Sequence, residues 1–202
     1  MTVRLLLADD QALVRGALSA LLQLEPDLEV VAEVGRGDEV VAAALASRPD
    51  VALLDVEMPG LDGIETTTAL RAALPTCRVL IVTTFGRPGY VRRALEAGAS
   101  GFVVKDTPAR QLADAVRRVH QGLRVVDPTL AVESLATGAT PLSARERDVL
   151  VAARAGGTAG DLARQLALSE GTVRNYLSSA MGKTGARTRA EAVRLADENG
   201  WL

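Results

Sequence analysis

The feature that most constrains the fold is an alternation of short apolar runs with helical repeats over the first 121 residues. The spacing predicts β-strands over Val3–Ala8, Leu28–Val34, Val51–Leu54, Val79–Val82 and Phe102–Val104. Helical patterns separate these runs, and parallel strands need such crossovers. We therefore predict an α/β domain built on a doubly wound parallel sheet. Five strands favour the flavodoxin-like order 2-1-3-4-5.

Strand signals stop after residue 141, and signals for helix starts replace them. Residues suited to cap helices recur at Ser143, Thr158, Ser169 and Thr188. This pattern predicts a small all-α domain over residues 141–202, after a first domain over residues 1–121. Residues 122–140 are predicted to form a linker with one short helix, which Asp127 would cap and which would end near Leu135.

Charge is distributed unevenly along the chain. Residues 1–121 carry a net charge of −3, whereas residues 142–202 carry +2, which indicates two domains with different partners. The single cysteine, Cys77, excludes an internal disulfide and is typical of a reducing cytosol. The first residues lack the long apolar core of a signal peptide, and no apolar run approaches the ~20 residues of a membrane span. We therefore expect a cytoplasmic protein with no membrane partner.

Polar side chains lie at the ends of four of the five predicted strands. Asp9 and Asp10 follow the first strand, Asp55 follows the third, Thr83 follows the fourth and Lys105 follows the fifth. In open parallel sheets, ligands bind outside the carboxyl ends of the strands at the point where the strand order reverses. The predicted order places this point between the first and third strands. The three acids are therefore expected to converge there, beside a hydroxyl and an ammonium group.

The charge of this cluster predicts its chemistry. Three neighbouring carboxylates repel one another unless protons or a cation neutralise them. Oxygen ligands with room for water suit Mg²⁺, so Asp9, Asp10 and Asp55 form a candidate magnesium site. Asp55 can then act as a nucleophile and form an aspartyl phosphate, whose oxygens Thr83 and Lys105 would hold. Each residue alone is more typical of a cap, a turn or a solvated loop, but their joint placement favours a functional site.

Four segments of residues 1–121 resemble the receiver domain of two-component response regulators, and they read LLADD, LLDVEMPGLDG, VTTF and GFVVKD. The resemblance implies that a sensor histidine kinase phosphorylates Asp55. It also implies that Glu57 adds its backbone carbonyl to the Mg²⁺ ligands. Thr83 would be the switch hydroxyl, Phe102 the switch aromatic residue, and Lys105 the lysine that these receivers carry.

The predicted helices around residue 167 are typical of a helix-turn-helix unit. The second of them is expected to run from Glu170 to about Met181 and to enter the major groove of DNA. Its inward stripe is predicted at Val173, Leu177 and Ala180. Candidate base contacts therefore fall at Arg174, Asn175 and Ser178. Candidate phosphate contacts are Thr172, Lys183, Arg187, Thr188 and Arg189. The alternative is a plain helical bundle whose polar residues are only solvated.

Three C-terminal segments resemble the LuxR-type DNA-binding domain of NarL/FixJ regulators, and they read PLSARERDVL, LARQLALSEGTVRNYLSSAM and TRAEAVRLA. Further segments resemble the DesR type of this family, namely TTFGRPGYVRRALEAG, GTVRNYLS and ENGWL. The resemblance implies a transcriptional regulator that binds double-stranded promoter DNA as a homodimer, with RNA polymerase as a further candidate partner. Ala159-Gly160 replaces the Asn-Lys pair common in the family, so intrinsic DNA affinity is expected to be low.

Two other functions remain open at this stage. One is a regulator that binds DNA without phosphorylation, and the other is a Mg²⁺-dependent phosphohydrolase. We expect no enzyme activity beyond self-phosphotransfer and autodephosphorylation at Asp55. Two dimer faces are also open. One combines the fourth helix, the fifth strand and the fifth helix and carries Arg92, Arg93, Arg117 and Arg118. The other combines the first and fifth helices through Leu13, Leu21, Leu112 and Val116, and the DesR-type resemblance favours it.

Overall fold

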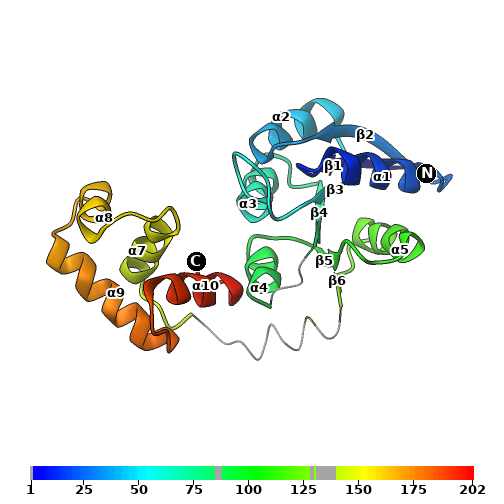
Figure 1. Ribbon diagram of the computed structural model, residues 1–202. Helices are drawn as coiled ribbons and strands as arrows, with labels where there is room; N and C mark the ends of the chain where they lie inside the picture. Colours follow the sequence, from blue (N-terminus) through cyan, green and yellow to red (C-terminus); the bar gives the residue numbers. More distant parts are fainter. Residues whose placement is uncertain (1, 85–87, 128–129, 131–139) are drawn as a thin grey trace. The chain divides into compact units, whose positions relative to one another are not determined.

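The computed structural model describes residues 2–84, 88–127, 130 and 140–202 (Figure 1). These residues form two compact units, which are described separately. The linker helix predicted between residues 127 and 135 falls largely outside the described residues. Among the described helices, none has the length and apolar character needed to cross a lipid bilayer.

The first unit is built on a six-stranded, fully parallel sheet of order β2-β1-β3-β4-β5-β6. Its strands are β1 (Val3–Ala8), β2 (Leu28–Val34), β3 (Val51–Leu54), β4 (Arg78–Thr83), β5 (Gly101–Val104) and β6 (Val125–Val126). The predicted fold class and the predicted order of the first five strands are confirmed. The predicted number of strands is wrong by one, because β6 extends the sheet beyond β5. A strand of two residues is too short to show the alternation from which strands are predicted.

Five helices connect these strands: α1 (Ala12–Gln23), α2 (Gly37–Ser47), α3 (Gly63–Ala73), α4 (Pro88–Glu96) and α5 (Ala109–His120). One face of the sheet is covered by α1 and α5, where Leu7, Leu53 and Leu80 pack with Leu22 and Val116. The helices α2 and α3 pack against each other over the opposite face. Strands buried on both faces explain the continuous apolar runs of the sequence.

The helix α1 carries more apolar surface than the sheet can cover. Leu22 is buried, whereas Leu13, Leu21 and Leu24 are 87%, 44% and 78% exposed. The part of α1 that packs against the sheet is therefore smaller than the apolar residues of its sequence would suggest. On α5, Leu112 and Val116 are buried, so they are not available for contact with another chain. Arg117 of α5 donates to Glu25 and Asp27, the residues that follow α1, at 2.6 and 2.7 Å.

The second unit is a four-helix domain of α7 (Ala144–Arg154), α8 (Ala159–Leu166), α9 (Glu170–Thr184) and α10 (Arg189–Glu198). Each helix begins with a side chain that accepts a backbone hydrogen bond, at Ser143, Thr158, Ser169 and Thr188. The core of this unit contains Val149, Leu150, Leu162, Val173, Leu177, Ala192 and Ala196. The helix α9 runs past its predicted end near Met181 and stops before Gly185, which adopts a left-handed conformation with φ of 70°.

One buried carboxylate fastens α7 to α9. Glu146 lies in the first turn of α7 and is only 4% exposed. Its oxygens accept hydrogen bonds from Ser143 N at 2.6 Å, Ser179 Oγ at 2.6 Å and Lys183 Nζ at 2.7 Å. Burial acts to raise the pKa of Glu146, but the hydrogen bonds from Lys183, Ser179 and Ser143 outweigh burial and lower the pKa to about 2. Glu146 therefore remains ionised inside the domain.

Candidate functional site

The carboxyl ends of the parallel strands bring the predicted pocket residues to one edge of the sheet. Asp9 follows β1 and Asp55 follows β3, and these strands are paired with Ala8 opposite Leu54. Asp55 N donates to Ala8 O at 2.9 Å, which holds the two strand ends side by side. Thr83 is the last residue of β4, and Lys105 follows β5.

Lys105 joins two of the acids directly. Its Nζ lies 2.7 Å from Asp9 Oδ2 and 2.8 Å from Asp55 Oδ2, and both carboxylates are buried. Asp10 is exposed, but its carboxylate completes the group, because carboxylate oxygens of all three acids lie within 4.8 Å of one another. The structure therefore brings together four residues that lie on three different strand ends.

Burial controls the protonation of this pocket. Burial raises the pKa of the Asp55 carboxyl, the ammonium of Lys105 opposes that effect, and the neighbouring charge of Asp9 raises the pKa further. Burial alone would lower the pKa of Lys105, but its hydrogen bonds to Asp55 and Asp9 raise that pKa. Lys105 thus remains a cation, and the ionised form of Asp55 depends on positive charge close by.

The donor set fits a hard divalent cation such as Mg²⁺. Asp9 Oδ1 accepts from Gln11 N at 2.9 Å, and Asp55 Oδ1 accepts from Val56 N at 2.7 Å. These bonds hold the Oδ1 atom of each buried carboxylate, and the Oδ2 atoms of both residues face Lys105 Nζ. One ammonium balances only part of the charge of three carboxylates, and oxygen ligands are those that Mg²⁺ prefers. Glu57 lies two residues beyond Asp55 with an exposed side chain.

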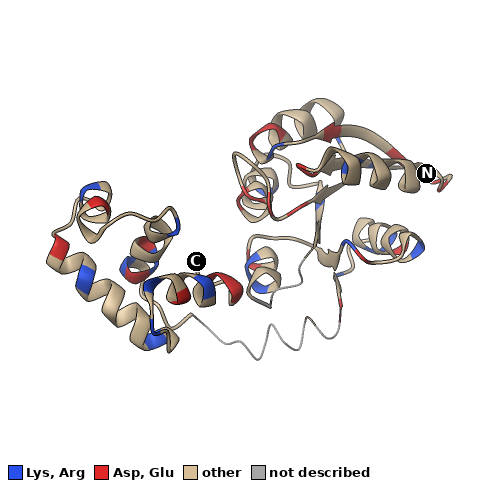
Figure 2. Cartoon of the chain, viewed as in Figure 1, with Lys and Arg blue, Asp and Glu red and all other residues tan. Residues whose placement is uncertain are grey.

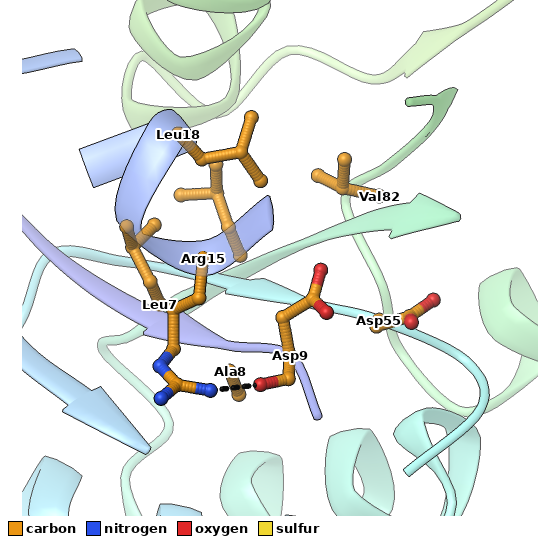
Figure 3. Close-up of a pocket in the computed structure, with 8 residues that line it drawn as sticks. Leu7, Ala8, Asp9, Arg15, Leu18, Asp55 and Val82 are labelled. Carbon is orange, nitrogen blue, oxygen red and sulfur yellow. Dashed lines mark hydrogen bonds between the residues drawn. The ribbon is translucent and has the colours of Figure 1, made fainter. Parts of the chain in front are cut away.

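Arg15, on α1, also belongs to this site, although its importance was not predicted from the sequence. It lines a small cavity with Leu7, Ala8, Asp9, Leu18, Leu53, Asp55 and Val82 (Figure 3). Its guanidinium donates to the backbone carbonyl of Asp9 and lies 3.7 Å from Glu33 Oε2. Arg15 therefore supports the loop that carries the first two acids. No sequence pattern distinguished it from an exposed helix residue.

The two predicted switch residues lie on neighbouring strands. Thr83 is buried at the end of β4, and Phe102 is fully buried on β5, which pairs with β4. In this structure the ring of Phe102 already points into the core. Any conformational change that involves Phe102 would therefore start from a buried ring.

The second unit contains the predicted helix-turn-helix in α8 and α9. Ala167 ends α8 in a left-handed conformation with φ of 53°, which allows the short turn before α9. Val173, Leu177 and Ala180 are buried, so α9 presents its other face to solvent. Arg174, Asn175 and Ser178 are exposed on that face. Figure 2 shows both acidic and basic residues along α9.

Four of the five predicted phosphate contacts already have a partner within the chain. The Thr172 hydroxyl lies 2.8 Å from Ser169 Oγ, and Lys183 Nζ donates to Glu146. Thr188 caps α10 by accepting from Glu191 N at 3.1 Å, and Arg189 Nη1 donates to Gly157 O at 2.6 Å. Arg187 is exposed, and only its backbone N has a described hydrogen bond, to Glu191. These residues stabilise the second unit whether or not they also contact phosphate.

Both units match known protein families. Residues 5–117 match the response regulator receiver domain, and residues 140–196 match the bacterial regulatory proteins of the luxR family. The fold and the site thus define a two-component response regulator with a DNA-binding output domain. The chain belongs to the LuxR family of response regulators, which are transcriptional regulators.

Particular relatives agree with this assignment over the full chain. The transcriptional regulatory protein DesR of Bacillus subtilis (strain 168) is 40% identical over 200 residues, which cover 99% of both chains. The transcriptional regulatory protein YvfU of the same organism is 41% identical over 200 residues, which cover 99% of this chain and 100% of the relative. The resemblance predicted from the sequence, including the likeness to DesR, is therefore confirmed.

Solved structures support the same fold. The response regulator ChrA of a heme-sensing two-component system matches with a TM-score of 0.59 and 33% identity, covering 100% of this chain and 99% of that chain. A complex of the response regulator RcsB with DNA matches with a TM-score of 0.68, covering 98% of this chain and 99% of that chain. Its identity of 21% supports the fold alone.

Proposed function

We propose that Asp55 accepts a phosphoryl group from a partner sensor histidine kinase and that the aspartyl phosphate promotes homodimerisation and promoter binding. The observation that carries this proposal is the contact of Lys105 Nζ with both Asp9 and Asp55, at 2.7 and 2.8 Å. An ammonium held at the acceptor carboxylate is suited to stabilise phosphoryl oxygens. In the transfer, an O–P bond forms at Asp55 while the N–P bond of the donor phosphohistidine breaks, and the released imidazole takes up a proton.

The other pocket residues would orient the acceptor and the transferred group. Asp9, Asp10, Asp55 and the backbone carbonyl of Glu57 would hold Mg²⁺, which when bound neutralises negative charge around the transferred group. The Thr83 hydroxyl would donate to a phosphoryl oxygen. Lys105 would remain beside Asp55 throughout and limit the repulsion between the carboxylate and the incoming phosphoryl group. Autodephosphorylation by water at the same residue would restore the resting state.

The face that we propose for the homodimer lies on α1, beside α5. Leu13 on α1 and Leu24, which directly follows α1, are among the most exposed large apolar residues that the structure describes, and Leu21 lies between them along the chain. Burial of such a stripe against a second copy would remove apolar surface from water. Arg117, Glu25 and Asp27 form a charged border at one end of this stripe. Such a border would define the register of the two copies.

Treatment with beryllofluoride and Mg²⁺, which imitates phosphorylation, is expected to convert the protein from monomer to dimer in analytical ultracentrifugation. Leu21→Glu should prevent this change, because it places a charge within the proposed apolar stripe. Leu45→Glu on α2 is the matched control, since Leu45 is 43% exposed and Leu21 is 44% exposed. Thr83→Ala should weaken the response to beryllofluoride.

Two results would contradict different parts of this proposal. A treated protein that stays monomeric up to about millimolar concentration yet binds promoter DNA tightly would contradict the coupling of phosphorylation to dimerisation. Equal loss of dimer in the Leu21 and Leu45 variants would contradict the dimer face on α1. Tight and selective promoter binding by the untreated monomer would instead favour a regulator that works without phosphorylation.

Arg174 is expected to read bases, because it is exposed on the face of α9 opposite the domain core. Arg174→Ala should relax the preference at one or two base pairs, at a cost of about 1–3 kcal/mol on the preferred site. Arg187→Ala should instead weaken binding to all sequences alike. The slope of log affinity against log salt concentration should also become less steep by about one unit. Lys183 is a poor choice for this comparison, since its removal would also leave Glu146 unpaired.

The measurement is fluorescence anisotropy on two DNA duplexes over a salt series. One duplex carries a site selected from random DNA by the unaltered protein, and the other carries the same bases in scrambled order. Equal losses of affinity for both duplexes in Arg174→Ala would show that Arg174 contacts only phosphate.

A further inference from the structure

An acidic residue lies at the start of the proposed recognition helix, next to the proposed base-reading arginine. Glu170 is the first residue of α9, and its Oε2 accepts from Arg174 Nη2 at 2.9 Å, one helical turn further on. Both side chains are exposed, at 53% and 70%. The face of α9 that is proposed to meet DNA therefore carries a negative charge.

The Glu170 carboxylate occupies space that a side chain at Gly160, in the neighbouring helix, would enter. A Cβ atom at Gly160, in the first turn of α8, would lie only 2.6 Å from Glu170 Oε1. Thr158, Gly160, Arg164 and Glu170 are among the residues that line an open hollow between α8 and the start of α9. The absence of a side chain at residue 160 thus leaves room for the carboxylate where it lies.

This arrangement affects the two kinds of DNA group that Arg174 can bind. A phosphate is an anion, and it is repelled by a carboxylate that stays beside the arginine. The O6 and N7 atoms of guanine are uncharged acceptors, so the same carboxylate opposes them much less. The exposed pair between Glu170 and Arg174 is weak, and two hydrogen bonds from a guanine edge can replace it. Glu170 therefore penalises contact with phosphate more than contact with a base.

We propose that Glu170 is a specificity-determining residue that keeps Arg174 away from phosphates on random DNA and available for a guanine edge on the correct site. Gly160 supports this role by leaving space for the Glu170 carboxylate. The proposal rests on the proposed binding of DNA through α9. Glu170 also lies in the first turn of α9, where an acid stabilises the helix dipole. That purely structural role would change stability and leave the ratio of specific to random DNA binding unaltered.

The test compares Glu170→Gln with Glu198→Gln in the full chain. Glu198 is a matched control, because it pairs with Arg194 four residues earlier at 2.8 Å and lies on α10. Both variants remove one negative charge and one exposed ion pair. We expect Glu170→Gln to raise affinity for the scrambled duplex about tenfold, to change affinity for the selected duplex much less, and to steepen the salt dependence on the scrambled duplex by about one unit. Glu198→Gln should leave the ratio of the affinities for the selected and the scrambled duplex unchanged.

Two further variants separate the possible explanations. Glu170→Gln in an Arg174→Ala background should have no effect on the ratio, since the acid acts through Arg174. Gly160→Ala should lower the ratio in the same direction as Glu170→Gln does, because its Cβ would lie 2.6 Å from Glu170 Oε1 and would displace the carboxylate without adding a charge that could bind phosphate. Equal shifts in Glu170→Gln and Glu198→Gln would show a general charge effect and overturn the proposal.

DNA reading through α9 and the specificity-determining role of Glu170 can be disproved separately. If the unaltered protein prefers no sequence in a random library, DNA reading through α9 is wrong, and the role of Glu170 is overturned with it. If Arg174→Ala loses sequence preference but Glu170→Gln keeps the full ratio, only the role of Glu170 is overturned. Thermal unfolding of each variant shows whether any change in binding follows from lost folding.

Discussion

Asp55→Asn is expected to abolish the uptake of phosphate from acetyl phosphate in the presence of Mg²⁺. The amide keeps the size of the side chain and an oxygen that can accept from Val56 N, so the fold should survive. An amide oxygen is a far weaker nucleophile than a carboxylate, and the variant therefore lacks the acceptor group. Intact-mass spectrometry should detect one added phosphoryl group on the unaltered protein and none on the variant.

A second acid serves as the control for this experiment. Asp38 is exposed, pairs with Arg36 at 2.9 Å and is not one of the three clustered acids, so Asp38→Asn should take up phosphate normally. An equal mass gain in Asp55→Asn and the unaltered protein would show that another residue is the acceptor. Rapid turnover of a generic phosphomonoester by the unaltered protein would instead favour the phosphohydrolase alternative.

Glu146→Ala is expected to lower the free energy of unfolding of the second unit by about 3 kcal/mol. The substitution leaves Lys183 Nζ, Ser179 Oγ and Ser143 N without the buried acceptor that they share. Trp201 is the only tryptophan of the chain and packs against the core of this unit, so its fluorescence reports unfolding of this unit during urea denaturation. Glu198→Ala removes an exposed pair and should cost only about 0.5 kcal/mol or less. Equal costs in the two variants would contradict the structural role of Glu146.

The carboxylate of Glu146 also predicts that the second unit loses stability at low pH. The pKa of Glu146 is lowered from its ordinary value of 4.5 to about 2. A lowered pKa in the folded state means that this stabilisation is fully present above about pH 4.5 and is lost as the pH falls toward 2. The loss should reach about 3 kcal/mol in the unaltered protein, because each pKa unit corresponds to ~1.4 kcal/mol. Glu146→Ala should show a flatter decline over the same pH range, and an equal decline would show that other groups cause it.

The sequence predicted the main sheet and the position of the acid cluster because both depend on local patterns. A buried parallel strand is a continuous apolar run, and the first polar residue after it marks the carboxyl end where ligands bind. Asp9, Asp55 and Lys105 could therefore be placed together, although up to 96 positions separate them along the chain. The helix caps of the second unit were predictable for the same reason, since a cap involves only the next three residues.

The features that were not predicted depend on which side chains meet in three dimensions. The two-residue strand β6 forms because the edge of β5 is open to pairing, and its own residues show no distinctive pattern. The apolar pattern of α1 did not reveal which leucines the sheet would leave exposed. The link that Glu146 forms between α7 and α9 was not predicted, because its bonds to Ser179 and Lys183 reach 33 and 37 residues along the chain. Partners that lie so far apart in the sequence cannot be recognised from local sequence patterns.

The bridge that Lys105 forms between Asp9 and Asp55 has a consequence for how the cell can keep this regulator ready. A resident ammonium gives the two buried acids, Asp9 and Asp55, a counterion of their own, which reduces their repulsion in the folded receiver before any dissolved ion binds. If the pocket binds Mg²⁺ as proposed, a fall in magnesium concentration should slow the response to a signal without reducing the amount of folded protein. The ability to respond and the stability of the folded protein would then be controlled separately. Protein that stayed folded at low magnesium could respond again once magnesium was restored, without new synthesis.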